Sequence, residues 1–298
     1  MALINALIVV AALAAVSVAL IARTDAARQR LELRQQADQA TRYLDGAALL
    51  TQRLIENAPP ETIHLRQAWA LPRRGEAIDR GTVSWEITDL QGRFNVNWLM
   101  RTDAMGEAAR IALPLLARAQ DVPAAVAGRL QNALDPLNLF RDSAFGGSAG
   151  VSSPPDLPLA MPNALRLVTG AGEAQLDALM PYLAALPHNS ALNINTTSPQ
   201  VLAAFLPSLR PRDLALLQER LEEAPFQDIQ DFLEWAELAF GEQSLLILEG
   251  LDLTTGSDWF EARLSARLDT VALQRSAVLH RREDTGRSEI VMSIPEVD

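Results

Sequence analysis

The stretch that most constrains the fold is the first part of the chain, where 22 residues carry no charged side chain. Within residues 1–22, only Asn5 and Ser17 interrupt a run of mostly Ala, Leu, Ile and Val, and the first charge is Arg23. An apolar run of about 20 residues is long enough to cross the hydrocarbon core of a bilayer as a helix. We therefore predict a transmembrane helix over residues 1–22.

Two alternatives for this stretch are a cleavable secretory signal and a buried core helix. A secretory signal needs a basic segment before its apolar run and a small-residue cleavage site behind it, and a core helix of this length carries more polar residues. Arginines follow the run and none precedes it, so counting basic residues alone places the large domain in the cytoplasm. Long downstream domains cross membranes largely regardless of charge. Removal of a short basic leader explains the missing residues, and Met1 is then a processed N-terminus.

The amino-acid composition excludes several classes of function. The chain has 298 residues, a formal net charge of -11 and no cysteine. Without cysteine it has no disulfide, thiolate nucleophile or thiolate metal site. An acidic chain has no general affinity for nucleic acid or anionic lipids. The length suffices for an anchor and one or two folded domains.

The residue pattern over 23–58 predicts an amphipathic stalk helix. Apolar residues recur near helical spacing between Gln, Arg and Asp, and two prolines at 59–60 stop the helix. The apolar stripe is longer than one small sheet can cover, so we expect part of it to contact partner proteins. The candidate contact residues are Ala27, Leu31, Leu44 and Ala48.

Alternation of apolar and polar residues predicts strands at both ends of the remaining sequence. Over residues 81–89, Val83 and Ile87 share one face of a half-buried strand. A Gln-Gly pair at 91–92 lies where a tight hairpin turn would, and the alternation resumes at Phe94. Near the C-terminus, three strand patterns separated by polar turns predict a meander over residues 259–268, 271–281 and 288–294.

Strands on both sides of a helical region imply one sheet interrupted by an insertion. We expect residues 59–98 and 256–298 to form the sheet and residues 99–255 to form an inserted all-helical domain. The predicted class is therefore α+β. A long N-terminal helix, first transmembrane and then stalk, packs on an antiparallel sheet that carries the insertion.

Short motifs in a fixed order resemble a known family. Residues 92–97 are Gly-Arg-Phe-Asn-Val-Asn, and residues 192–197 are Leu-Asn-Ile-Asn-Thr-Thr. With the half-apolar N-terminal helix and shorter blocks at 165–170, 181–187 and 259–262, they resemble minor pseudopilin K of type II secretion systems, also called general secretion pathway protein K. The signature residues are Gly92, Arg93, Phe94, Asn95, Asn97, Asn193, Asn195 and Thr196.

The resemblance implies a pilin-like sheet domain and a structural, non-enzymatic role. Members of this family cap the tip of a short periplasmic pseudopilus with minor pseudopilins I and J, above pseudopilin H and the major pseudopilin, for protein export across the outer membrane. The implied location is the inner membrane, with a single span and the large domain in the periplasm. The implied processing is leader removal and N-methylation at Met1. Most pseudopilins carry Glu at the fifth position, and Asn5 in its place suits a subunit that starts the filament.

The chain departs from this family in the first part of the insertion, where members carry an acidic, calcium-binding run. Calcium takes six to eight oxygen ligands, and the corresponding stretch here offers Asp135 and Asp142. Because two carboxylates are too few for a tight site, we favour a flexible loop over residues 143–162 to a calcium site. The resemblance implies no required cofactor and no small-molecule substrate.

Two rival functions rest on local motifs. Residues 146–150 match the G-x-S-x-G pattern of hydrolases but lack a strand before the serine and a helix after it, so we predict no catalytic residues. Residues 192–234 resemble the helix-hairpin-helix modules of membrane-anchored DNA-uptake receptors, which makes DNA binding the alternative function. The hairpin lacks a glycine, and Glu222 and Glu223 would repel phosphates. We therefore expect a packing scaffold and no nucleic-acid partner.

Overall fold

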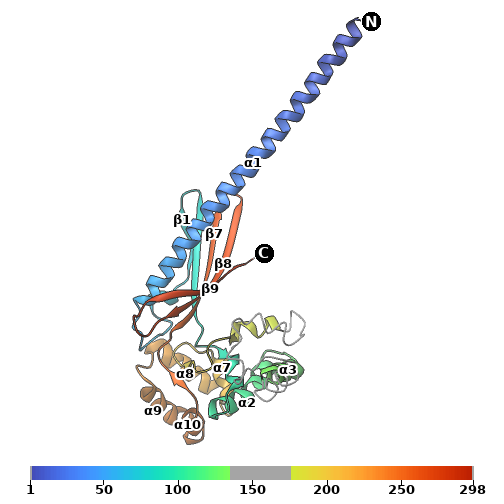
Figure 1. Cartoon of the computed structure of the whole chain (residues 1–298). Helices are drawn as coiled ribbons and strands as arrows, with labels where there is room; N and C mark the ends of the chain where they lie inside the picture. Colours follow the sequence, from blue (N-terminus) through green and yellow to red (C-terminus); the bar gives the residue numbers. More distant parts are fainter. Residues whose placement is uncertain (1, 135–175, 297–298) are drawn as a thin grey trace, which may run out of the picture.

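The computed structural model describes residues 2–134 and 176–296, which form a long helix, a sheet and a helical domain (Figure 1). Helix α1 (Ala2–Glu56) projects far beyond the sheet at its N-terminal end, and its C-terminal half lies on the sheet. The helical domain lies at the end of the sheet away from the N-terminus. Helix α1 ends three residues before Pro59, as the predicted stop requires.

The sheet has five strands in the order β1-β2-β7-β8-β9, and all neighbours are antiparallel. The strands are β1 (Arg73–Ile78), β2 (Gly81–Asp89), β7 (Trp259–Leu268), β8 (Val271–Arg281) and β9 (Ser288–Glu296). Strands β2 and β7 pair along their whole length although the insertion separates them in sequence. This pair confirms one sheet interrupted by a helical insertion, and β7 to β9 confirm the predicted meander.

The helix packs on the sheet because each presents an apolar face. Leu44, Ala48 and Ile55 of α1 are at most 2% exposed. Alternate residues of β7 from Phe260 to Leu268 are buried beneath them, as the two-residue period of a strand requires. Trp69 closes the end of this core, with its ring 5.4 Å from that of Phe260.

The inserted domain has a second core built around three aromatic rings. Phe94, Trp98 and Phe205 contact one another, with ring centroids 5.6 to 5.9 Å apart. The helices around them are α2 (Ala104–Ala119), α3 (Ala124–Leu134), α7 (Pro199–Phe205), α8 (Pro211–Glu223), α9 (Ile229–Phe240) and α10 (Glu242–Leu248). Two short parallel pairs bind the chain segments together: β3 (Phe94–Asn95) with β4 (Leu183–Ala184), and β5 (Leu192–Asn193) with β6 (Leu253–Thr254). The prediction that residues 99–255 are all helical is therefore wrong, because the segments that enter and leave the domain pair as short strands.

The hairpin expected at residues 91–92 is wrong. Both edges of β2 are already occupied, by β1 on one side and β7 on the other, so β2 has no free edge for a returning strand. The chain instead leaves the sheet after Asp89, and Phe94 pairs in parallel with Leu183. A 3-10 helix (Val96–Met100) follows directly, which ends the alternation seen in the sequence.

The predicted transmembrane helix over residues 1–22 is not confirmed. Helix α1 is continuous through this stretch, but no helix in the described part of the chain combines the length and apolarity needed to cross a bilayer. Other predictions fall outside the described residues. They concern Met1, the candidate calcium ligands Asp135 and Asp142, the motif at 146–150, the loop at 143–162 and the block at 165–170.

Candidate assembly site

The signature residues lie where the chain leaves the sheet for the insertion and where it returns. Residues 92–97 follow β2, residues 193–196 follow the first residue of β5, and residues 255–258 lead into β7. Each of the four signature asparagines is at most 2% exposed. Buried amides need partners at both ends, and here those partners are other parts of the same junction.

Asp89, the last residue of β2, is the centre of this junction. One carboxylate oxygen accepts the N–H of Gln91 at 2.8 Å. The other accepts Nδ2 of Asn193 at 2.9 Å, Oγ1 of Thr196 at 2.6 Å and Oγ of Ser257 at 2.6 Å. Burial raises the pKa of Asp89, and these four hydrogen bonds oppose the rise. The carboxylate therefore ties the outgoing strand to both the insertion and the returning segment.

Asn193 and Asn195 extend the junction into the insertion. Asn193 Nδ2 also lies 3.1 Å from the Ile63 carbonyl, and its Oδ1 accepts the N–H of Asn195 at 2.9 Å. The side chain of Asn195 pairs with the backbone of Phe226 like a neighbouring strand. It donates to the carbonyl and accepts from the N–H, both at 2.9 Å. These bonds fix the segment that enters α9.

The asparagines at 95 and 97 repeat the same arrangement. Asn95 Oδ1 accepts the N–H of Asn97 at 3.1 Å and that of Leu186 at 3.1 Å, and its Nδ2 donates to the Pro187 carbonyl at 2.9 Å. Asn97 Nδ2 donates to the Leu186 carbonyl at 2.7 Å. In both motifs the first asparagine accepts from the second, the Asx-turn geometry in which a side chain replaces a backbone turn. The two motifs fasten separate loops to one junction.

Two further signature residues bring the junction close to the sheet. A Cβ on Gly92 would lie 2.6 Å from Oγ1 and 2.7 Å from the carbonyl oxygen of Thr196, so only glycine fits. Arg93 Nη2 lies 3.3 Å from Glu261 Oε2 on β7. Burial lowers the pKa of Arg93, and the Glu261 carboxylate opposes that change.

Arg281 is a junction residue that sequence reasoning missed. It is 2% exposed, and its Nη1 donates to the Ala58 carbonyl just after α1 at 3.2 Å. Its Nε lies 3.4 Å from Asp258 Oδ1, and Nη2 donates to the Ser257 carbonyl. The signal was present in the strand period. Arg281 shares the buried face of β8 with Ala277, an unusual place for a charge unless it is paired.

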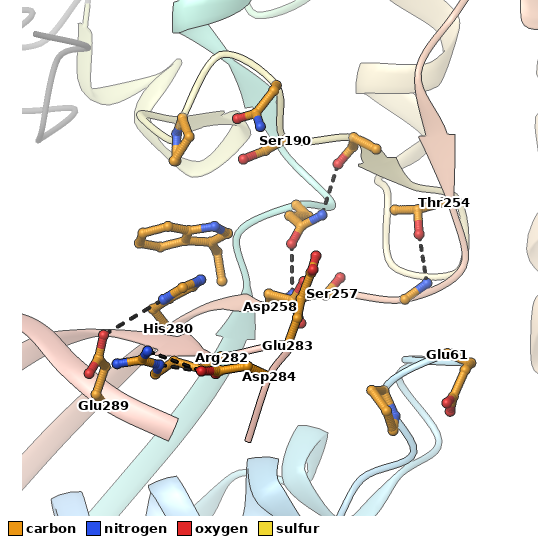
Figure 2. A pocket seen from close by; sticks show the side chains of 17 residues that line it. Glu61, Ser190, Thr254, Ser257, Asp258, His280, Arg282, Glu283, Asp284 and Glu289 are labelled. Atoms are coloured by element: carbon orange, nitrogen blue, oxygen red, sulfur yellow. Dashed lines mark hydrogen bonds and ion pairs between the residues drawn. The ribbon is translucent and has the colours of Figure 1, made fainter. Parts of the chain in front are cut away.

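An open pocket of about 890 Å³ lies beside this junction (Figure 2). The Trp259 ring stacks on the His280 ring, with centroids 4.2 Å apart. His280 Nδ1 is 3.9 Å from the Glu289 carboxylate, and Arg282 pairs with Asp284 at 3.2 Å. These polar groups thus contact one another along the wall. Among the residues with described positions, no three His, Asp or Glu side chains are grouped to hold a metal ion.

The predicted stalk contacts divide into two pairs. Leu44 and Ala48 are 2% exposed because they pack on this chain's own sheet, so neither can face a partner and the prediction is corrected for them. Ala27 is exposed, and Leu31 is 57% exposed. Within residues 23–58, the sequence analysis missed three further exposed leucines. We define the stalk surface as Ala27, Leu31, Leu33, Leu49 and Leu50.

The hairpin of the helix-hairpin-helix module predicted over residues 192–234 lies between α7 and α8. Its arginines contact a carboxylate of the same chain. Arg210 donates through its backbone N–H and its Nε to Asp213 Oδ2, at 2.9 and 3.0 Å. Arg212 Nε lies 3.4 Å from Asp213 Oδ1. Arg210 foremost lowers the pKa of Asp213 to about 2, so the carboxylate is charged at neutral pH. A phosphate would have to displace it, which disfavours the DNA-binding alternative.

The fold and junction define a class: a protein with a long N-terminal helix, an antiparallel sheet and an inserted, mostly helical domain. A chain in the crystal structure of the GspK-GspI-GspJ complex from the enterotoxigenic Escherichia coli type 2 secretion system has this fold. It superposes with a TM-score of 0.68 and 22% identity, covering 90% of this chain and 100% of that chain.

Sequence comparisons find similarity to proteins of one kind. The model for type II secretion system protein K matches residues 192–252. The Klebsiella pneumoniae type II secretion system protein K is 32% identical over 188 residues, which cover 58% of this chain and 57% of that protein. The Pseudomonas aeruginosa protein K is 29% identical over 262 residues, 78% of this chain and 74% of that protein. The chain is thus similar to type II secretion system protein K, and the resemblance inferred from the signature motifs is confirmed.

Proposed function

We propose that this protein is a minor pseudopilin, a structural subunit that helps to start the tip of a type II secretion pseudopilus. One observation carries the proposal: the whole frame of helix, sheet and insertion matches a chain of the GspK-GspI-GspJ complex over 90% of this chain. The sequence relatives support the same role, since each is a type II secretion system protein K. The alternative, DNA uptake, has only the helical hairpin in its favour.

The proposed role involves no catalysis, and the junction chemistry supports that. The carboxylate of Asp89 and the amides of Asn193 and Asn195 hydrogen-bond groups of the same chain. Such a network fixes one orientation of the insertion on the sheet. A subunit at the end of a filament needs this rigidity because its neighbours bind the stalk while its insertion faces outward.

The proposed partners are minor pseudopilins I and J, followed by pseudopilin H and the major pseudopilin, and the proposed contact is the stalk surface. Leu31 is 57% exposed, Leu33 49% and Leu49 64%. Apolar burial contributes roughly 25 cal/mol per Å², so covering these leucines with equivalent helices would stabilise a complex. Leu31 and Leu49 share one side of α1 and Leu33 lies on the other, so the exposed apolar side chains surround the helix, as expected where more than one partner helix covers it.

We further propose that residues 1–22 anchor the chain in the inner membrane and that the large domain lies in the periplasm. The support is the absence of charge from this stretch and the exposure of its described side chains. Leu13, Val16 and Leu20 are 62 to 66% exposed, which is unfavourable in water. Processing at Met1 and a filament-starting role for Asn5 belong to the same proposal.

The test is co-purification of the full chain with pseudopilins I and J. Leu31→Asp combined with Leu49→Asp should weaken the ternary complex by at least about 100-fold, because two leucines that the partners would bury, at about 1.5 to 3 kcal/mol each, become charged. Leu71→Asp, at a 52% exposed position outside α1, is the matched control and should leave the complex intact. An unchanged complex in the double variant would move the contact away from the stalk surface.

A further inference from the structure

Helices α9 and α10 lie at the end of the inserted domain far from the N-terminus (Figure 1). They carry exposed apolar side chains among carboxylates. Leu238 is 90% exposed, Leu246 66% and Ile247 37%. The opposite sides of these two helices are buried in the domain, through Phe232 and Leu248 among others. We call this surface the distal face, made of Glu237, Leu238, Glu242, Leu246, Ile247 and Glu249.

A glycine corner holds the two helices of the distal face together. Gly241 has a φ of 84°, a conformation that favours glycine, and it directly joins α9 to α10. Leu238 lies three residues before this corner and Leu246 five residues after it. At 1.5 Å per residue, both lie within about 8 Å of the corner along their helix axes. The leucines are therefore presented on a defined element of the fold.

The charges around these leucines have one sign. Residues 229–250 contain five carboxylates and no Arg, Lys or His: Asp231, Glu234, Glu237, Glu242 and Glu249. Asp231 lies 3.6 Å from Arg220, and Glu234 accepts from Gln230 at 3.0 Å. Within the described chain, Glu237, Glu242 and Glu249 have no cation within ion-pair distance. The rim of the distal face is consequently free to bind cations from outside.

The negative charge around the distal face limits which kind of partner can bind there. Two copies of the distal face would bring carboxylates together, anionic lipid head groups would be repelled, and so would nucleic acid phosphates. We propose that the distal face docks a protein whose contact surface has an apolar centre ringed by Lys and Arg. The inference rests on the proposed function, since a tip subunit covered along its stalk surface leaves this opposite end free.

The experiment places a photo-reactive residue in the full chain, in cells with an active secretion system. Leu238→p-benzoylphenylalanine should give one defined protein adduct, whereas the same substitution at Leu216, 48% exposed on α8, should not. Glu237→Arg with Glu242→Arg should lower the adduct yield about tenfold, because reversing rim charges slows association. The matched control is Glu61→Arg with Glu283→Arg, two exposed carboxylates elsewhere, and should change nothing.

The mapped contact should contain apolar residues flanked by Lys or Arg. No adduct at Leu238, an adduct with a second copy of this chain or with lipid, or a yield that survives the charge reversal would overturn the inference. Co-purification with pseudopilins I and J from the same cells separates the two proposals. If that complex forms without the adduct, only the docking inference fails. If the adduct forms without the complex, only the proposed function fails.

Discussion

The junction and the stalk surface use opposite chemistry in the same chain. At the junction, a carboxylate and four amides are buried and their bonds end on other groups of the junction, as for Asp89 and Asn193. On the stalk, leucines such as Leu31 remain exposed. A buried polar network costs stability unless every group is paired, so its value is a defined geometry. Exposed apolar side chains contribute stability only when a partner covers them, so their value is assembly.

The largest expected effect comes from breaking the junction. Asn193→Ala removes the amide that bonds Asp89, Ile63 and Asn195, and leaves buried groups without partners. At about 1 to 3 kcal/mol for each unsatisfied group, we expect the free energy of unfolding to fall by about 3 to 5 kcal/mol. Urea unfolding measures it, with the exposed Gln230→Ala as control. A loss below about 1 kcal/mol would mean that the network does not hold the junction together.

The next largest expected effect is a difference in stability between leucine-to-alanine substitutions on the two sides of α1. Leu44→Ala removes a side chain packed on the sheet, and we expect a loss of about 2 to 5 kcal/mol in the free energy of unfolding. Leu31→Ala removes an exposed side chain of the same size and should change stability by less than about 0.5 kcal/mol. Thermal unfolding of both variants is the measurement. Equal losses would show that the isolated chain already covers Leu31.

Strand positions in this protein could be predicted from the sequence because two-residue alternation depends only on local burial. The bounds of β2 and the start of β7 follow from that period. The hairpin prediction failed because the partner of Phe94 is Leu183, and nothing local encodes a parallel pair across the insertion. The stalk prediction placed Leu31 and Leu44 in one apolar stripe, but 13 residues at 3.6 per turn put them about 140° apart around α1. Which of them is covered depends on where the sheet ends along α1.

The sequence predicted most residues of the junction but not Asp89, the residue at its centre. The signature asparagines were identified by resemblance, whereas Asp89 was only the last residue of a predicted strand. Its role arises from donors on Thr196 and Ser257, which are brought to it by the return of the chain into β7. Such convergence is a property of topology and leaves no periodic signal in the sequence.

The smallest expected effect is on how the free energy of unfolding depends on pH. Burial raises the folded-state pKa of Asp89, so the folded protein holds the Asp89 proton more tightly than the unfolded chain does. The stability that this group contributes is complete below the unfolded-state pKa of about 4 and is lost as pH rises through the folded-state value. Asp89→Asn should flatten this part of the pH profile of unfolding. The control is Asp45→Asn, at an exposed position of α1 that pairs with Arg275 of β8. This substitution should leave the same part of the pH profile unchanged. A profile equal to the wild type in Asp89→Asn would locate the titration elsewhere.

The central claim is that a rigid junction presents a stalk that assembles with smaller pseudopilins. The most direct measurement is the mass in solution of the detergent-solubilised full chain mixed with pseudopilins I and J, by size exclusion with light scattering. We predict one stable species that contains one copy of each of the three proteins. A chain that elutes alone at every ratio, while I and J bind each other, would contradict the account.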